Sequence, residues 1–529
     1  MSDIIQNGLD KGWKVTSADT LEDKSTIEAD VAIIGTGAGG ATSAEFLSKA
    51  GFKVLLIEEG KLRYQKDFKM NELEAFSTLY QEATSRKTSD AAINIYQGRT
   101  VGGSTTVNWT STFRTPEKTL DFWASEYGLS DYTSAKMAHW FKDREQALNM
   151  SPWLVPPNAN NSTLKQGCDS LGWSSHTMVR NVKGCWNLGY CGFGCPTNAK
   201  QSMLVTSIPS ALDNNASLLT CARAERFHFK GDKVSHLECQ ALDSEAFETT
   251  GKSITVKAKH FVLSAGAIGS PAVLLRSDAP DPHNTLGKRT FLHPVNSCSA
   301  TMPNEIRPYE GAPQSVYSDQ FLWRDGVAGE IGFKLEASPA FPGGIAAQEA
   351  LFGDALAKRI ASLAHTQSMI SLLRDGFNEE SPGGEVILRS DGSPALDYPI
   401  NEYLISGFVQ SYLAMAEAQF AAGAKTVTAV HHDAKDWKSW TEAKKAIKEL
   451  PMGPLRAALF SAHVMGGCGM GSDPKQSVVN GHGEHHQIEN LNVIDGACFP
   501  TSIGANPQLS IYGLAAKQAT QLATRLKFG

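Results

Sequence analysis

Three cysteines in the middle of the chain could hold a metal. Cys185, Cys191 and Cys195 fall within eleven residues, out of nine cysteines in total. Thiolates at such short spacing bind zinc or an iron–sulfur cluster. A zinc site would also need a fourth ligand and a close cysteine pair, and neither is visible here. We expect buried structural thiols and no metal, with the iron–sulfur cluster and the zinc site kept as alternatives.

A run of glycines near the start of the chain has the spacing that binds a dinucleotide. The first glycine permits a tight turn, the second lets a pyrophosphate approach the backbone, and the last allows close packing of a helix on a strand. The phosphates would then meet the N-terminus of that helix, and an acid at the end of the next strand would accept from a ribose hydroxyl. The predicted residues are Gly35, Gly37, Ala38, Gly40 and Glu58.

A strand–helix–strand unit must position these residues. Residues 30–34 are a β-branched apolar run that is typical of a buried parallel strand. Residues 41–47 predict a helix, and residues 53–57 predict a second buried strand that ends on Glu58. The order favours a Rossmann-type α/β domain. Its position at the start of the chain favours bound FAD over a dissociable nicotinamide.

Further motifs lie in the middle and at the end of the chain. A second glycine cluster covers residues 98–108, and a small-residue segment covers 262–271. Two more motifs lie near the C-terminus, at residues 463–471 and 491–508. In this order they resemble the signatures of the glucose–methanol–choline (GMC) family of flavin oxidoreductases, over essentially the whole chain. Residues 371–398 and the segment around Pro507 are most similar to the long-chain (fatty) alcohol oxidase branch.

The resemblance implies further contacts to FAD. No histidine occurs between residues 98 and 115, where some members of that family attach the flavin. We therefore expect non-covalent FAD. The cofactor-binding residues implied by the resemblance are Arg99, Gly102, Gly103, Ser104, Asn108, Asp495, Pro507 and Gln508.

The resemblance also implies a catalytic pair, His463 and Asn506. A histidine suits the removal of a hydroxyl proton, since its pKa lies near working pH. His463 would accept the proton of an alcohol, Asn506 would orient its oxygen, and hydride would pass to flavin N5. Asn506 is expected to open the last helix, whose N-terminus would stabilise negative charge at the flavin.

The expected activity is FAD-dependent oxidation of a long-chain or otherwise apolar aliphatic alcohol to the aldehyde or ketone. The electrons would pass to oxygen or to an external acceptor. Two alternatives stay open. One is a dehydrogenase subunit that passes electrons to a partner through an iron–sulfur cluster. The other is a non-redox lyase on the same fold.

Length and composition divide the chain into units. With 529 residues, 41% of them hydrophobic and 20% charged, the chain is an ordinary globular protein too long for one core. The motifs predict a discontinuous FAD-binding domain over 27–295 and 455–529, with a cysteine-containing insertion near 184–201. An α+β substrate-binding domain with an antiparallel sheet takes 296–454, and 1–26 form an N-terminal extension.

Within the predicted substrate domain, residues 326–335 suggest a strand. Residues 351–374 place leucines and isoleucines at helical spacing.

Charge and hydropathy limit the partners. The net charge is −6, with no basic stripe that would bind nucleic acid. The N-terminus is polar, and no apolar run reaches about 18 residues. We expect a cytoplasmic enzyme and keep peripheral membrane contact as an alternative.

Overall fold

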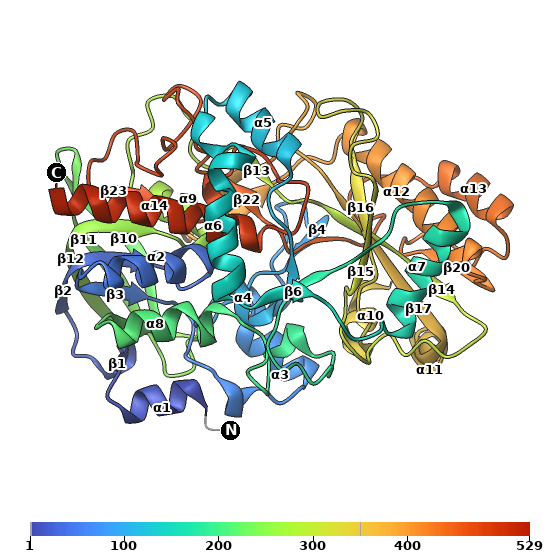
Figure 1. Ribbon diagram of the computed structural model, residues 1–529, viewed down its shortest axis with the longest axis horizontal. Helices are drawn as coiled ribbons and strands as arrows, with labels where there is room; N and C mark the ends of the chain where they lie inside the picture. The colour runs from blue at the N-terminus through green and yellow to red at the C-terminus, as the bar shows by residue number, and fades with distance from the viewer. Residues whose placement is uncertain (1–2, 350, 529) are drawn as a thin grey trace.

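The computed structural model describes residues 3–349 and 351–528, and two large β-sheets lie side by side in it (Figure 1). The first sheet runs in the order β1-β9-β3-β2-β12-β11-β10, with β23 paired to β12. It is parallel from β1 to β12 and antiparallel from there to β10. Its strands are β1 (Lys14–Ser17), β2 (Ser25–Ile34), β3 (Val54–Ile57), β9 (Ser217–Thr220), β10 (Ala222–Lys230), β11 (Lys233–Leu242), β12 (Thr249–Leu263) and β23 (Leu491–Val493).

The carboxyl ends of the parallel strands gather the site residues at one edge of the first sheet. The last four residues of β2 and all of β3 are buried, as expected of strands covered on both faces. Because β2, β3, β12 and β23 run in the same direction, Gly35, Glu58, Ser264 and Asp495 follow neighbouring strand ends. The predicted strand–helix–strand unit is confirmed.

Glycine is required where helix α2 (Ala38–Lys49) leaves the sheet. Gly35 has a φ of +98°, and a Cβ added to it would lie 2.3 Å from the Ser264 carbonyl oxygen. A Cβ on Gly40 would lie 2.0 Å from the Gly35 carbonyl oxygen. The helix therefore packs against the strand end more closely than any side chain would allow.

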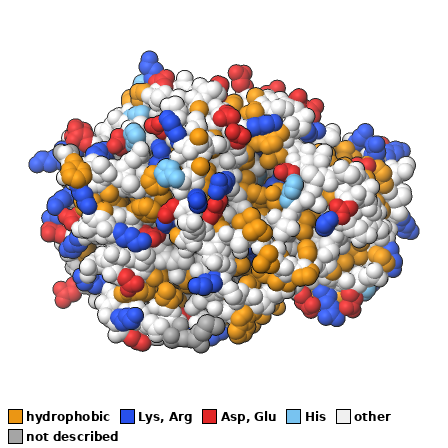
Figure 2. All heavy atoms as spheres, in the orientation of Figure 1, with side chains coloured by type: hydrophobic (Ala, Val, Ile, Leu, Met, Phe, Trp, Pro, Cys, Tyr) orange, Lys and Arg blue, Asp and Glu red, His pale blue; other side chains and the backbone are white. Residues whose placement is uncertain are grey.

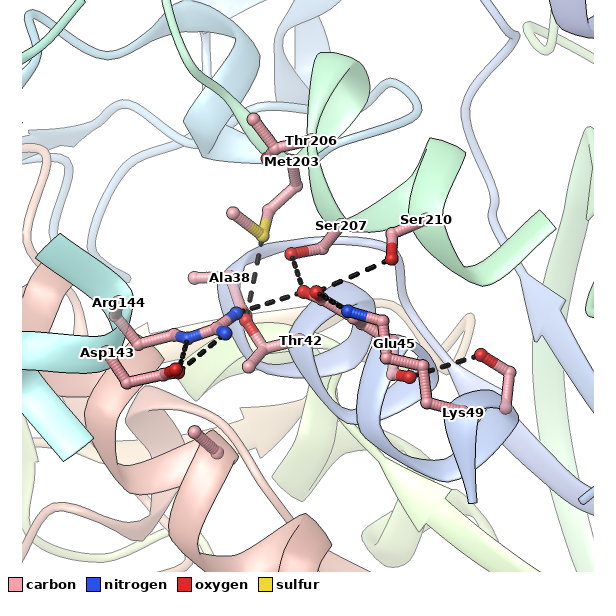
Figure 3. A network of polar contacts seen from close by, with 12 residues as sticks. Ala38, Thr42, Glu45, Lys49, Asp143, Arg144, Met203, Thr206, Ser207 and Ser210 are labelled. Atoms are coloured by element: carbon pink, nitrogen blue, oxygen red, sulfur yellow. Dashed lines mark hydrogen bonds and ion pairs between the residues drawn. The ribbon is translucent and has the colours of Figure 1, made fainter. Parts of the chain in front are cut away.

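A buried carboxylate fixes α2 to its neighbours (Figure 3). Glu45 pairs with Arg144 of α6 (Ser134–Ala147) at 2.9 Å and with Lys49 at 2.6 Å, and it accepts from Ser207 Oγ at 2.7 Å. Ser207 begins α8 (Ser207–Asp213). One side chain thus joins three helices. The C-terminal helix α14 (Gln508–Phe528), red in Figure 1, also packs against α2.

The second sheet is mostly antiparallel and runs in the order β4-β21-β14-β17-β16-β15-β7, with β20 paired to β14. Helix α12 (Glu402–Ala421) packs on β14 and β17. The strands are β4 (Ile93–Ile95), β7 (His176–Thr177), β14 (Val295–Thr301), β15 (Val316–Phe321), β16 (Phe333–Glu336), β17 (Thr366–Leu373), β20 (Thr426–Ala429) and β21 (Leu459–Ser461).

The sheets draw strands from outside the predicted segments. Residues 1–26, predicted as an extension, contribute β1 to the edge of the first sheet. The second sheet takes β4 and β7 from within 27–295 and β21 from within 455–529. The domain boundaries themselves stay a prediction, while the α/β class with a Rossmann-type sheet is confirmed.

Two predicted elements in the second half are wrong. Residues 351–374 do not form one helix: α11 (Gly353–Ala361) is followed by β17. Every residue of β17 is buried, so its apolar residues show no strand alternation and imitate helical spacing. Of the predicted strand at 326–335, only residues from Phe333 onward are extended, in β16. Asp325 Oδ2 accepts from Glu330 N at 2.9 Å and folds the preceding residues into a loop.

No helix in residues 3–349 and 351–528 is both long and apolar enough to cross a bilayer. On the face drawn in Figure 2, basic and acidic side chains alternate and do not gather into a stripe of one sign.

Candidate active site

A cavity of about 1690 Å³ extends from the first glycine run to the predicted catalytic pair. It is larger than the usual 300–1,000 Å³ of a site for one small molecule, so it has room for a cofactor and a substrate. Two predicted residues, Gly40 and Gly102, lie outside its lining. The predicted residues that line it are Gly35, Gly37, Ala38, Glu58, Arg99, Gly103, Ser104, Asn108, His463, Asp495, Asn506, Pro507 and Gln508.

The two glycine clusters meet at the cavity wall. A Cβ on Gly103 would lie 2.9 Å from Gly37 Cα, whereas a Cβ on Gly37 would meet nothing within 4 Å. Gly37 precedes the first residue of α2, and the first N–H groups of a helix have no partner within it. Open space beside free N–H groups is suited to a phosphate.

Glu58 and Arg99 are held in place by protein groups. Glu58 accepts from the backbone N of Thr36 at 3.1 Å and of Gly60 at 2.9 Å, and also from the Thr36 hydroxyl. Burial raises the pKa of Glu58 to about 7. Arg99 pairs with Glu59 at 2.9 Å. Their contacts to a ribose or phosphate stay predictions.

Asp495 connects the end of β23 to helix α9 (Gly266–Arg276). Its carboxylate accepts from Gly266 N at 2.7 Å, Ser270 Oγ at 2.8 Å and Ala497 N at 2.8 Å. Burial raises its pKa to about 6. Asp495 therefore shapes this wall of the cavity by holding two segments together.

The second glycine cluster is anchored from behind by Lys200. Its Nζ donates to the carbonyl oxygens of Thr106 and Asn108, both at 2.8 Å, and of Cys191 at 2.6 Å. Burial lowers the pKa of Lys200 to about 8. Asn108 Nδ2 in turn donates to Gln508 Oε1 at 2.8 Å, which joins the cluster to the start of α14.

His463 is paired with a second histidine. The Nδ1 atoms of His463 and His293 are 3.0 Å apart, and the rings are stacked. The backbone N–H groups of Leu292 and His293 donate to Asp375, both at 3.0 Å. Since Nδ1 of His463 faces His293, Nε2 is the nitrogen left for the cavity. Burial, and then the nearby charge of Lys334, lower the pKa of His463 to about 3, so the ring is neutral at physiological pH.

Asn506 stands two residues before α14, which begins at Gln508, so the expectation that it opens the helix is wrong by two positions. Its Oδ1 accepts from Nζ of Lys334 in β16. Lys334 Nζ lies 2.8 Å from Glu336 Oε1 of the same strand, and both side chains are fully buried. The structure thus brings His463 and Asn506 to one cavity and supports each with a further polar residue.

Strands β14 and β17 form the wall beyond this pair. Val295, Ile370, Leu372 and Phe460 make an apolar cluster that lines the cavity. Val295 is two residues after His293 in the chain, and it pairs with both Leu372 and Phe460. This apolar cluster is the part of the wall next to His293 in the chain, while Ser297, Ser299 and Ser368 of the same two strands also line the cavity.

The three cysteine thiols have separate hydrogen-bond partners. Cys185 Sγ accepts from Asn187 N at 3.4 Å, Cys191 Sγ from Arg180 at 3.5 Å, and Cys195 Sγ from Lys200 N at 3.4 Å. In the described residues no group of three or more His, Cys, Asp or Glu could hold a metal ion. The geometry therefore gives no support to the iron–sulfur or zinc alternatives.

Sequence reasoning missed His293, Lys334, Glu336 and Lys200. The alternation of charge with apolar residues in the strand Phe333–Glu336 is the one signal that could have drawn attention to the ion pair.

Comparisons with known proteins bear on the family and the fold of the chain. Two GMC oxidoreductase family models match residues 76–295 and 380–515, and a NAD(P)-binding Rossmann-like model matches 33–61. The long-chain-alcohol oxidase FAO1 of Arabidopsis thaliana is 26% identical over 99% of this chain and 70% of its own. FAO4B of the same plant is 27% identical over 97% of this chain and 69% of its own.

Among solved structures, a variant of formate oxidase from Aspergillus oryzae RIB40 superposes with a TM-score of 0.69 at 16% identity. It covers 96% of this chain and all of its own. At that identity the likeness shows the fold alone.

Proposed function

The chain belongs to the GMC oxidoreductase family, and we propose from that premise that it oxidises apolar aliphatic alcohols, with His463 as the base. It is an FAD-dependent oxidoreductase acting on CH–OH donors. The observation that carries the proposal is the meeting of His463 and Asn506 in one cavity with both glycine clusters.

The residues present fit FAD. The open space at Gly37 beside the N-terminus of α2 suits the pyrophosphate, and the cavity continues without interruption to His463. Gly35, Gly37, Ala38 and Glu58 would hold the dinucleotide end, and Gly103, Ser104 and Asn108 would hold the flavin end. FAD bound there supplies the hydride acceptor. We propose that it is held without a covalent bond, since the second glycine cluster has no histidine.

His463 would remove the hydroxyl proton of the alcohol. This role requires the tautomer in which His463 Nδ1–H donates to His293 Nδ1, 3.0 Å away, because Nε2 then presents a lone pair to the cavity. The His463 pKa of about 3 keeps that lone pair free at physiological pH, although it is lower than the expected value near working pH and makes the ring a weaker base. Asn506 would donate a hydrogen bond to the oxygen as negative charge develops there. The neighbouring apolar side chains would favour contact with an alkyl chain over contact with water.

The apolar wall supports an aliphatic substrate. Val295, Ile370, Leu372 and Phe460 offer hydrocarbon surface next to the histidine pair. The relatives FAO1 and FAO4B are long-chain-alcohol oxidases, which supports the same substrate class here. Each methylene buried on such a wall contributes about 0.8 kcal/mol. Affinity should therefore rise with chain length.

Spectroscopy of the purified flavoprotein tests the proposal. A series of primary alcohols of increasing chain length is added without oxygen, and flavin absorption is followed. We expect bleaching, with kcat/KM rising along the series. His463→Ala should lose about 10²–10⁴-fold, while His482→Ala, at an exposed histidine of the same C-terminal region, should not. The proposal fails if no alcohol bleaches the flavin.

The electron acceptor is decided by a separate measurement. Hydrogen peroxide released during turnover in air identifies oxygen as the acceptor. Turnover only with an added dye identifies a dehydrogenase.

A further inference from the structure

A buried ammonium group stands behind Asn506. Lys334 does not line the cavity, and its side chain is 1% exposed. Nζ contacts Asn506 Oδ1 and Glu336 Oε1, and it lies 3.6 Å from the ring centroid of Phe113. A carboxylate, an amide oxygen and an aromatic face therefore hold this ammonium in one position.

The chemistry of the two groups allows one arrangement. An ammonium has three N–H donors and no acceptor, whereas a side-chain amide has an oxygen that accepts and an NH₂ group that donates. Asn506 must turn its oxygen toward Lys334. Nδ2 is then the polar group that it presents to the cavity, which it lines.

We propose that Lys334 is a positioning residue that fixes the amide of Asn506 so that its N–H, and not its carbonyl oxygen, meets the substrate oxygen. This inference rests on the proposed function. The N–H stabilises the negative charge that develops as His463 takes the proton, whereas a carbonyl oxygen would repel it. Glu336 pairs with Lys334, so neither charge is buried alone behind Asn506.

Two single substitutions test the orientation of the amide. Asn506→Asp keeps the shape of the side chain and the acceptor for Lys334, but it replaces the N–H with an oxygen. We expect kcat/KM to fall by about 10²–10³-fold, at least as far as in Asn506→Ala. An Asn506→Asp enzyme with near wild-type kcat/KM would overturn the inference.

A double-mutant cycle tests whether Lys334 acts through Asn506. The background Lys334→Met/Glu336→Met removes both charges together, because loss of one alone would leave the other buried and unpaired. In this background the amide can turn, so Asn506→Ala should cost less than about tenfold instead of about 10²–10³-fold. Equal costs in both backgrounds would show a purely structural ion pair. If this background does not bind flavin, the kcat/KM of Asn506→Asp alone decides whether the amide N–H must face the substrate oxygen.

Binding of decanoate to the holoenzyme gives a readout apart from turnover. Its carboxylate accepts from Nδ2 as a developing alkoxide would, and its chain suits the apolar wall. In the wild-type background, calorimetry should show that Asn506→Ala weakens decanoate binding by about 10–100-fold. In the Lys334→Met/Glu336→Met background, Asn506→Ala should change decanoate binding little.

The outcomes separate the two proposals. A decanoate cycle as predicted, without oxidation of any alcohol, removes the proposed function and keeps the role of Lys334. If the enzyme oxidises alcohols but Asn506→Ala has the same cost in both backgrounds, the proposed function stands and the role of Lys334 is removed. If the enzyme neither oxidises alcohols nor binds decanoate, both proposals are contradicted.

Discussion

His463, the proposed base, has a charge state that is set by its surroundings. It is buried, it faces the neutral His293, and Lys334 is the cation near it. Both burial and a positive neighbour disfavour the imidazolium. His463 therefore stays neutral at pH values well below the usual histidine pKa of about 6.5.

The pH dependence of alcohol oxidation should reflect this. The neutral ring is the active form, so activity is lost only as pH falls through a pKa of about 3. We expect kcat/KM to show no loss from His463 between about pH 8 and 5. The measurement is a pH profile at subsaturating alcohol. An acidic limb with a midpoint near 6.5 would contradict the low pKa.

His293 should matter although it does not line the cavity. His293→Ala removes the ring and leaves Nδ1 of the buried His463 without its partner. An unpaired buried donor costs about 1–3 kcal/mol, so kcat/KM should fall by about 5–150-fold while flavin content stays unchanged. His482→Ala is the matched control. Unchanged kcat/KM in His293→Ala would show that the pair has no part in the reaction.

The supporting residues could not be predicted from sequence. His463 and Asn506 stand within recognisable motifs, but His293 lies 170 positions from His463 and Lys334 lies 172 positions from Asn506. The residues next to either partner in the chain do not specify these contacts. The packing of β16 brings Lys334 to Asn506, and the turn before β14 brings His293 to His463.

At the scale of elements, α2 depends on the Glu45 carboxylate. Burial alone would raise its pKa, but the charge of Arg144 and the bonds from Lys49 and Ser207 lower it overall. Glu45→Ala removes the buried partner of Arg144 and leaves it only the more exposed Asp143, 2.6 Å away. Breaking a buried pair outright costs about 3–5 kcal/mol, so with Asp143 still in place the loss should be no more than that. The free energy of unfolding in urea measures this. Asp169→Asn, at an exposed helical pair with Lys165, should cost less than about 1 kcal/mol.

Acid should remove the stabilisation that Glu45 gives to the folded protein. Its pKa is lower in the folded protein than in the unfolded chain, so its stabilisation is complete above the unfolded value of about 4.5. It is lost as pH falls through the folded pKa. The stability difference between the wild type and Glu45→Ala should therefore shrink below about pH 4.5. A difference that grows there would reverse the sign of the pKa shift.

Elements with a clear local pattern were predictable. The strand that ends at Ile34, the glycine turn and α2 follow from a buried apolar run and a motif. The strand β17 was not, because burial on both faces removes the alternation by which strands are recognised.

At the scale of the whole molecule, the cavity depends on both sheets. Its lining combines the carboxyl ends of the parallel strands with residues of β14 and β17. A ligand that fills it contacts both halves and stabilises the folded state by mass action, about 2.7 kcal/mol at 100 times Kd.

Thermal unfolding should therefore depend on flavin. Adding FAD to the apoprotein should raise Tm in a concentration-dependent way, and FMN, which lacks the adenosine that would reach Glu58, should raise it less. Differential scanning calorimetry measures both. Equal shifts from FAD and FMN would show that the first glycine run is not used.

The discontinuous plan was partly predictable at this scale. Motifs at both ends of the chain indicated that distant segments build the parallel sheet, as β2 and β23 do on either side of β12. The short strands β4, β7 and β21 were not foreseen, because two or three residues carry no periodic signal.

The histidine pair has a conformational cost. His293 has a φ of +48°, in the left-handed region that suits glycine or asparagine, and in the described residues its buried Nε2 has no hydrogen-bond partner. Such backbone strain costs about 1–3 kcal/mol. Selection for stability alone should therefore replace His293 with a residue that relaxes the backbone. If the turn orients His463 as the proposed base, substitutions at His293 that make the protein more heat-resistant should reduce its turnover.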